Sequence, residues 1–174
     1  MQIYYNLFDE TEDEKIKGQL LLNKVLNIKG YNVENIKIQR TTHGRPYSND
    51  LDFDFNISHT KGMACVVTGG KVGVDCQKIV PVKNSVAKRV CSDKELETLL
   101  NSSNYNEEFI RLWCFKEAFT KMVGSGFKYG FKNATVENAF CLCENIKIFQ
   151  KRIDDIIITA VQEQGNEIKI TEIQ

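Results

Sequence analysis

Two acidic residues, Asp75 and Glu117, are the strongest candidates for chemistry in this sequence. Asp75 lies in the segment VGVDCQ (72–77), which alternates apolar and polar residues like a half-buried strand. Because burial of a lone carboxylate is costly, we expect a cation near Asp75. Glu117 precedes Lys121 by one helical turn, so both side chains lie on one helix face. Mg²⁺ takes one or two protein carboxylates together with substrate phosphates, so the two acids could form a magnesium site for a pyrophosphate-containing ligand.

The same residues also have ordinary structural interpretations. A Glu117–Lys121 pair on a helix surface is common and contributes only roughly 0.2–0.5 kcal/mol. Asp75 could lie at a strand end in contact with water. Two acids that are distant in the sequence do not establish a metal site by themselves, so spacing alone leaves both interpretations open.

A second group of polar residues could bind an anion. In NISH (56–59), Ser58 and His59 lie at the expected end of a strand, where a histidine either bonds locally or contacts a phosphate. Arg45 lies in the turn-rich segment HGRPYSND (43–50). It is either a solvated loop cation or a planar donor that binds phosphate through two N–H groups.

The hydrophobic pattern predicts the elements that must position these residues, and it indicates an α+β fold. The sequence predicts strands over 2–8, 35–40, 53–58, 63–68, 71–76, 146–150, 156–162 and 167–173, and helices over 12–28, 84–89, 92–100 and 106–123. Ser92 and Glu95 are spaced for a capping box at the third helix. In the longest helix, four apolar residues should face the core: Leu112, Phe115, Phe119 and Met122. We expect the last three strands to form an antiparallel meander, and the chain to divide into lobes at residues 1–70 and 71–174.

Composition narrows the classes of protein. The 174 residues carry a formal net charge of +0, which argues against a nucleic-acid-coating protein and against a small RNA-binding module. No run of about 18 apolar residues predicts a membrane span, and the acidic N-terminal segment does not resemble a secretion signal. The six cysteines mostly lie in apolar segments, which favours free thiols in a reducing compartment. We therefore expect a cytoplasmic protein that binds neither membrane nor nucleic acid.

Five segments together resemble one family. They are GRPY (44–47), FNISHT (55–60), VGVDCQ (72–77), AKRVCSDKELETLL (87–100) and LWCFKEAFTKMVGSG (112–126). Their order and spacing are similar to those of phosphopantetheinyl transferases of the surfactin-synthetase-activating type. The resemblance implies two similar α+β lobes in a pseudo-twofold arrangement, with coenzyme A in the cleft between them. It also implies Mg²⁺-dependent transfer of the 4′-phosphopantetheine group to a serine of an apo acyl or peptidyl carrier protein. The other product is adenosine 3′,5′-bisphosphate, as in the holo-acyl-carrier-protein synthase class.

The resemblance also implies roles for the residues of the long helix and of strand 71–76. Asp75 and Glu117 correspond to magnesium ligands that hold the metal against the pyrophosphate of coenzyme A. Lys121 resembles the lysine that contacts this pyrophosphate, and Lys116 is expected to assist it. Glu117, directly or through a metal-bound water, would help to deprotonate the carrier serine.

For the adenosine end of coenzyme A, the resemblance implies another set of contacts. Arg45 and His59 resemble contacts to the 3′-phosphoadenosine, with Ser58 beside them. Backbone groups near 56–58 and 71–73 are expected to hold the adenine. An exposed apolar segment with basic neighbours, 78–92, is the expected docking surface for an acidic carrier protein. A single chain with both lobes completes the cleft, so we expect a monomer.

The sequence departs from the family pattern at Gln77. Many relatives have an acid two residues after the aspartate, whereas Gln77 offers only a neutral oxygen, so we expect it to contribute weakly to the metal site. The early basic residues for the 3′-phosphate are also not evident, and Lys15, Lys17 or Arg40 could replace them. These departures leave one alternative, a non-catalytic descendant of the family that binds coenzyme A or a carrier protein.

Overall fold

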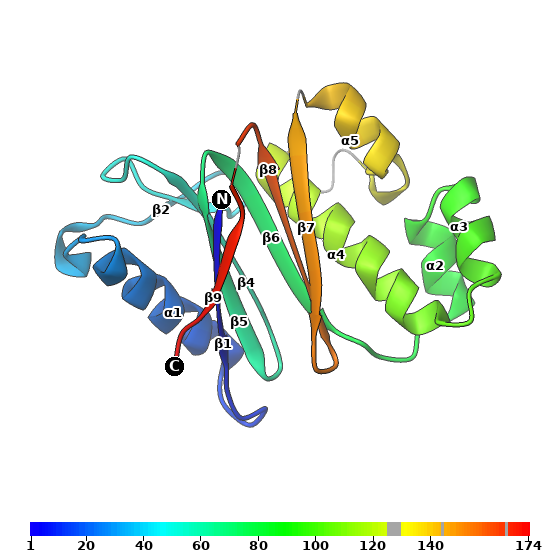
Figure 1. Ribbon diagram of the computed structural model, residues 1–174, viewed down its shortest axis with the longest axis horizontal. Coiled ribbons are helices and arrows are strands. Elements are labelled where there is room, and N and C mark those ends of the chain that lie inside the picture. Colours follow the sequence, from blue (N-terminus) through cyan, green and yellow to red (C-terminus); the bar gives the residue numbers. More distant parts are fainter. Residues whose placement is uncertain (125–129, 144, 166) are drawn as a thin grey trace.

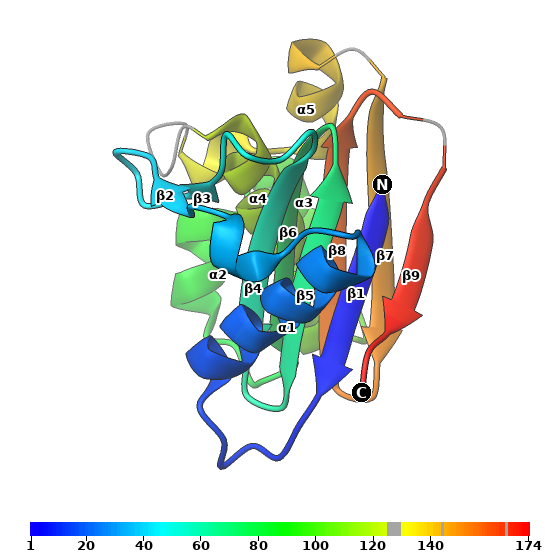
Figure 2. The same cartoon turned by 90° about the vertical axis from the view of Figure 1, so that its left-hand side faces the viewer.

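The computed structural model describes residues 1–124, 130–143, 145–165 and 167–174, and it confirms the α+β class. Two sheets stand side by side, and each is covered by one long helix (Figure 1). The N-terminal sheet contains β1 (Gln2–Leu7), β4 (Asp54–Thr60), β5 (Met63–Gly69) and β9 (Lys169–Glu172) in the order β4-β5-β1-β9. Helix α1 (Glu14–Ile28) covers this sheet (Figure 2) and buries Leu21, Leu22, Val25 and Leu26 against it.

The second sheet contains β6 (Lys71–Lys78), β8 (Ile156–Glu163) and β7 (Ile146–Ile153) in the order β6-β8-β7. Helix α4 (Tyr105–Val123) packs on it. Phe115, Phe119 and Met122 are buried as the sequence predicts, and Leu112 packs half-buried against the neighbouring part of the core. The helix ends at Gly124, whose φ of 76° lies in the left-handed region that favours glycine.

The two halves repeat one connectivity. Along the chain, each half has a first strand, then its long helix and then a β-hairpin. In the sheet, the second strand of the hairpin lies in the middle, so the spatial order is β1-β5-β4 in the first half and β6-β8-β7 in the second. In both halves the middle strand is antiparallel to its two neighbours. This repeat supports the expectation of two similar lobes.

Smaller elements fill the connections. They are the 3₁₀ turns η1 (Val33–Asn35) and η3 (Phe131–Asn133), the short strands β2 (Gln39–Arg40) and β3 (Pro46–Tyr47), and the helices α2 (Asn84–Val90), α3 (Asp93–Leu100) and α5 (Val136–Leu142). The predicted capping box of Ser92 and Glu95 is present at α3. The predicted strand over 35–40 is wrong except at its last two residues, and α5 was not predicted. Among the described residues, none of the helices has the length and apolar character that a membrane span requires.

The last strand corrects the expected meander. β9 does not pair with the β7–β8 hairpin; instead it runs parallel to β1, with Gln2 opposite Lys169 and Tyr5 opposite Glu172. The reason is that β8 already bonds to β6 on one edge and to β7 on the other, so it offers no edge to a further strand. β1 bonds to β5 on one edge only, and β9 takes the other.

The two halves meet where β4 lies beside β6. Three alternate residues of β4 accept hydrogen bonds from three alternate backbone N–H groups of β6: Asp54 Oδ2 from Val72 (3.0 Å), Asn56 Oδ1 from Val74 (3.1 Å) and Ser58 Oγ from Cys76 (3.3 Å). We call this row the β4–β6 seam. It satisfies the N–H groups on the edge of β6 that does not pair with β8, and such groups are costly to bury without a partner. The FNIS part of the family segment is therefore a structural joint between the halves.

Gly73 sets the depth at which α4 lies on β6. A Cβ atom at this position would lie 2.0 Å from the Ala118 carbonyl oxygen and 2.6 Å from the Met122 nitrogen. Both are backbone atoms of α4, so the side chain could not be accommodated without moving the helix. The absence of a side chain at Gly73 thus allows α4 to bring Glu117 and Lys121 close to the strand that carries Asp75.

We predict that Gly73→Ala destabilises the fold strongly. The free energy of unfolding should fall by at least about 2–3 kcal/mol, because the added methyl group displaces backbone rather than a flexible side chain. Denaturant unfolding measures this change. Gly70→Ala is the matched control: its added Cβ would meet only the Gln162 amide at 3.5 Å and the Glu163 oxygen at 3.9 Å, so the loss should stay near about 0.5 kcal/mol. Equal stability of the two variants would contradict the close approach of α4.

Candidate active site

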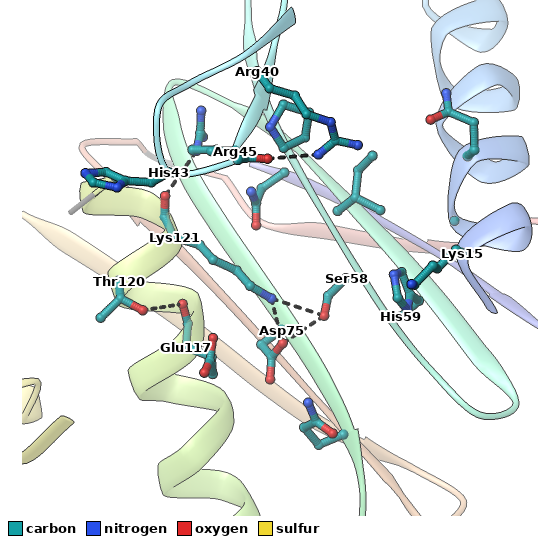
Figure 3. Close-up of a pocket in the computed structure, with 18 of the residues that line it drawn as sticks. Lys15, Arg40, His43, Arg45, Ser58, His59, Asp75, Glu117, Thr120 and Lys121 are labelled. Atoms are coloured by element: carbon teal, nitrogen blue, oxygen red, sulfur yellow. Dashed lines mark hydrogen bonds and ion pairs between the residues drawn. The ribbon is translucent and has the colours of Figure 1, made fainter. Parts of the chain in front are cut away.

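A cavity of about 860 Å³ lies along the β4–β6 seam. Its lining comes from α1, from the loop that connects β2 to β3, from β4 and β6, and from α4 (Figure 3). Of the residues predicted to form the site, all but one line this cavity: Arg45, Ser58, His59, Asp75, Gln77, Glu117 and Lys121. The exception is Lys116.

Asp75 is the most buried acid of the cavity, with 2% of its surface exposed. Its Oδ1 atom accepts hydrogen bonds from Ser58 Oγ at 2.8 Å and from Lys121 Nζ at 2.7 Å. Lys121 also donates to Ser58 Oγ at 3.2 Å and to the Val74 carbonyl at 3.1 Å. The expected cation beside Asp75 is therefore the Lys121 ammonium, which reaches it from α4 (Figure 3).

Asp75 Oδ2 is buried and has no hydrogen-bond partner within the described part of the chain. Glu117 faces the same space from α4, and burial, together with the nearby charge of Asp75, raises the pKa of Glu117. Burial alone would lower the pKa of Lys121, but Asp75 and Glu117 outweigh it and raise that pKa. The single ammonium group of Lys121 thus neutralises only one of the two desolvated carboxylates, Asp75 and Glu117. The site keeps an excess of negative charge, and Asp75 Oδ2 keeps no hydrogen-bond partner among the described residues.

This chemistry fits a divalent cation. Mg²⁺ prefers oxygen ligands and needs only one or two carboxylates when substrate phosphates complete its coordination. Asp75 and Glu117 would supply the carboxylates. Gln77 lies two residues beyond Asp75 on β6, on the same face of the strand, and its amide oxygen also borders the cavity. The described residues contain no cluster of three or more His, Cys, Asp or Glu side chains that could hold a metal on their own.

Arg45 lines the cavity but is held by protein atoms. Its Nη2 donates to Asp54 Oδ2 at 2.6 Å and to the Val72 carbonyl at 3.0 Å, and its Nε donates to the Lys121 carbonyl at 3.0 Å. The guanidinium group therefore joins the β2–β3 loop to both strands of the seam and to the end of α4. A solvated loop cation, the ordinary interpretation of Arg45, is excluded.

The side of the cavity formed by α1 and the β2–β3 segment is basic. Lys15, Arg40, His43 and His59 line the cavity; in Figure 3, Lys15 and His59 lie at α1, whereas His43 lies near the end of α4. His59 Nδ1 lies 3.5 Å from Glu14 Oε1, and Arg40 donates to the Gly44 carbonyl at 2.8 Å. Of the basic residues considered for the 3′-phosphate, Lys15 and Arg40 are thus placed in the cavity. Lys17 does not line it and pairs with Glu12 instead.

Lys116 is not in the cavity. Its side chain is fully buried, and its ammonium group donates to both oxygens of Glu95, at 3.0 and 2.8 Å, and to the carbonyls of Phe131 (2.9 Å) and Ala134 (3.1 Å). The expected contact of Lys116 with coenzyme A is therefore replaced by a buried ion pair with α3. Its position could have signalled this, because it follows Leu112 by four residues and precedes Phe119 by three, on the core face.

Sequence reasoning also missed several polar residues that shape the site. Asp54 and Asn56 hold the seam, and His43 borders the cavity. The signal for the first two was the alternation in DFNIS, where every second residue is polar within a strand whose other residues are apolar. Nothing in the spacing of His43 indicated a site. Ser125 and Gly126, the end of the WCFKEA-containing segment, lie outside the described residues.

Comparison with known proteins relates the chain to one family. A family model described as the 4′-phosphopantetheinyl transferase superfamily matches residues 71–166, which is more than half of the chain. The matched part includes β6 with Asp75 and α4 with Glu117 and Lys121.

Individual relatives agree with the family model. The chain is 30% identical over 123 residues to the 4′-phosphopantetheinyl transferase psf-1 of Bacillus pumilus, covering 68% of this chain and 53% of that protein. It is 31% identical over 116 residues to gsp of Aneurinibacillus migulanus, covering 63% and 47%. It is 31% identical over 123 residues to Sfp of Bacillus subtilis strain 168, covering 67% and 54%. The chain thus spans about half the length of these curated relatives.

We predict that Lys121→Met destabilises the protein even without ligand. The change leaves the buried carboxylate of Asp75 without its cation, so the free energy of unfolding should fall by about 2–3 kcal/mol. This loss is smaller than for a fully buried ion pair, because the Lys121 side chain is partly exposed. Urea unfolding of wild type, both single variants and the double variant Asp75→Asn/Lys121→Met measures the coupling. The double variant should recover part of the loss. Additive losses would show that the two groups do not interact.

Proposed function

The chain belongs to the 4′-phosphopantetheinyl transferase superfamily, and from this premise we propose that it transfers the 4′-phosphopantetheine group of coenzyme A to a serine of an apo carrier protein. The reaction releases adenosine 3′,5′-bisphosphate and belongs to the holo-acyl-carrier-protein synthase class. The observation that carries this proposal is the meeting of Asp75, Glu117 and Lys121 at one cavity between the halves.

The charge of the cavity supports an anionic substrate. Although the whole chain has a formal net charge of +0, the described residues that line the cavity include four Lys or Arg side chains and two carboxylates, together with two histidines. Coenzyme A carries a pyrophosphate and a 3′-phosphate. We assign the pyrophosphate to the region of Lys121, and the 3′-phosphoadenosine to the basic side of the cavity, with Arg45, Ser58 and His59 among its contacts. Lys15 and Arg40 take the place of the basic residues that relatives carry earlier in the chain.

Asp75 and Glu117 would hold Mg²⁺, with Gln77 offering a neutral oxygen. When bound, the metal supplies Lewis-acid stabilisation of charge on the phosphate oxygens. The Lys121 ammonium adds a fixed positive charge at the same place, and the raised pKa of Lys121 keeps this group protonated. Neutralisation of developing negative charge is the main demand of phosphoryl transfer.

Glu117 is suited to accept the proton of the attacking serine. In the metal-free protein, burial and the charge of Asp75 raise the pKa of Glu117 above that of an ordinary glutamate, and a carboxylate beside the attacking hydroxyl can serve as a general base. The serine oxygen attacks the β-phosphorus of coenzyme A, its proton passes to a Glu117 oxygen, and the bond to the bisphosphate breaks. Seam residue Ser58 orients Asp75 and Lys121 through two hydrogen bonds and undergoes no chemical change.

The surface beside α2 is the proposed docking site for the carrier. Within residues 78–92, Val80 and Val86 are exposed, and the basic residues Lys83, Lys88 and Arg89 of the same segment are exposed as well. An apolar patch with basic neighbours suits an acidic carrier protein. We also propose that the protein acts in the cytoplasm as a monomer.

One observation favours a second candidate function. Because Gln77 carries no charge, the chain could bind coenzyme A or a carrier protein without transfer. The deciding assay combines purified protein, coenzyme A, Mg²⁺ and several apo carriers, with detection by mass spectrometry. We expect the mass of one phosphopantetheine arm to be added to at least one carrier. Binding of coenzyme A with no mass gain on any carrier would favour the non-catalytic alternative.

We predict that Asp75→Ala and Glu117→Ala each abolish transfer while the fold is retained. Each change removes one of the two carboxylates available to the metal, and the second also removes the proposed base. Single-turnover transfer measured by mass spectrometry tests this, with circular dichroism to verify folding. Glu137→Ala on α5, an exposed acid outside the cavity, is the control and should keep full activity. Wild-type rates in either site variant would refute the metal assignment.

Gln77→Glu is predicted to lower the Mg²⁺ concentration needed for half-maximal rate. A third carboxylate on the cavity face of β6 adds negative charge beside Asp75 and strengthens the attraction of a divalent cation. Titration of the transfer rate with Mg²⁺ measures the effect. An unchanged or higher requirement would place Gln77 outside the coordination sphere.

A further inference from the structure

The buried pair of Lys116 and Glu95 is more than a link between two helices. Lys116 is one of the largest fully buried side chains, and its ammonium group contacts four acceptor oxygens. Glu95 Oε2 also accepts the Ser92 N–H at 2.8 Å in the capping box of α3. Desolvation of two buried charges largely offsets their mutual attraction, so such a pair adds little net stability but fixes the relative positions of the groups it joins.

Lys116 of this pair also binds the segment that contains Phe131, and Phe131 contacts Trp113 in the wall of the cavity. Lys116 binds the Phe131 carbonyl at 2.9 Å, and the Phe131 ring stacks on Trp113 with centroids 4.9 Å apart and an interplanar angle of 26°. Trp113 in turn lines the cavity, one helical turn before Glu117. A connected path of contacts therefore runs from the Glu95–Lys116 pair through Phe131 to the indole ring.

Trp113 borders the end of the cavity that is farthest from Arg45 along α4. Three of the cavity-lining residues of this helix, Trp113, Glu117 and Lys121, succeed one another by about one turn each. Arg45 binds the Lys121 carbonyl at the far end of this row. Under the proposed function, on which this assignment depends, the adenosine lies toward the Arg45 end. The Trp113 end therefore faces the transferred arm and the incoming serine.

We infer that Lys116 is a positioning residue: together with Glu95 and Phe131 it holds Trp113 as the wall beside Glu117, and it does not bind a phosphate of coenzyme A. An aromatic wall at this place restricts where the transferred arm and the serine can lie relative to Glu117. Reactions of this kind are sensitive to displacements of about 1 Å. Loss of the ion pair should therefore affect the chemical step more than the binding of coenzyme A.

Trp113 is the only tryptophan of the chain, so its fluorescence reports this wall directly. The first experiment measures the emission maximum and acrylamide quenching of the full chain without ligand. Lys116→Met and Glu95→Gln should shift the emission to the red and increase quenching, because the Phe131 backbone loses or weakens its hydrogen bond from the Lys116 ammonium and the indole ring becomes more accessible. Lys94→Met is the matched control: Lys94 lies beside Glu95 but forms an exposed pair with Glu137, so its emission should equal wild type.

Phe131→Leu gives an independent test should Lys116→Met fail to fold. It removes the ring from Trp113 but retains the backbone carbonyl that Lys116 binds, so it should reproduce the red shift. Wild-type emission in folded Lys116→Met and Glu95→Gln would overturn the inference, as would wild-type emission in Phe131→Leu.

The second experiment measures kcat and KM for coenzyme A with Mg²⁺ and an apo carrier. Lys116→Met should lower kcat by about tenfold or more, while KM for coenzyme A stays close to wild type. Lys121→Met, which changes the proposed pyrophosphate contact, should raise KM. A rise in KM for Lys116→Met as large as that for Lys121→Met would overturn the positioning role. Absence of transfer by wild type would refute the proposed function instead, and the fluorescence experiment would still decide the role of Lys116.

Discussion

The arrangement of this protein depends on how the free edge of β6 is satisfied. β6 pairs with β8 on one side, and its other edge faces β4 without a direct backbone ladder. Side chains take the place of that ladder: β4 supplies three acceptors for the N–H groups, and Arg45 and Lys121 donate to the carbonyls of Val72 and Val74. Strands joined by a direct ladder lie about 4.7–4.9 Å apart. Interposed side chains hold two strands further apart, and the cavity lies along this wider joint.

The same side chains that complete the seam also form the site. Ser58 accepts from Cys76 as part of the joint and donates to Asp75 as part of the site. Lys121 satisfies the Val74 carbonyl and neutralises Asp75. The position of the two halves and the charge balance of the cavity are therefore coupled, because a displacement of β4 relative to β6 would break contacts of both kinds. Gly73 adds a further constraint, since it allows the backbone of α4 to approach β6 closely.

Local sequence patterns predicted most helices and strands, but they did not predict how strands from distant parts of the chain pair. The stripe of Phe115, Phe119 and Met122 correctly predicted which face of α4 is buried, because helical periodicity depends only on neighbours in the sequence. The partner of β9 could not be predicted in this way, since it depends on which strand edges remain open after the rest of the sheet has formed. The segment 35–40 illustrates the same limit, because its alternation resembles a strand but most of it lies beside no partner strand.

For the candidate site as well, the sequence identified some residues correctly and misplaced another. Asp75, Glu117 and Lys121 were identified from residue type, spacing and family resemblance, and the structure brings them to one cavity. The family resemblance predicted that Lys116 assists Lys121 at the pyrophosphate, but its side chain is buried outside the cavity. Adjacent residues on a helix point about 100° apart, so the neighbour of a site residue commonly faces the core. A buried lysine is then tolerated only where an acid such as Glu95 reaches it, and that partner, on another helix, is not evident from the sequence.

If the cavity holds a cation as proposed, the neutral Gln77 would lower the cation affinity of the site but favour the stability of the metal-free fold. Asp75 and Glu117 already share one ammonium group, and the raised pKa of Glu117 shows that a charged carboxylate is disfavoured there. A third carboxylate would raise this repulsion further and would be relieved only when a cation binds. An amide at Gln77 avoids that cost and still presents an oxygen to the cavity. Under the proposed function the loss would fall on cation affinity, and the substrate pyrophosphate would contribute a larger share of the attraction that holds the metal.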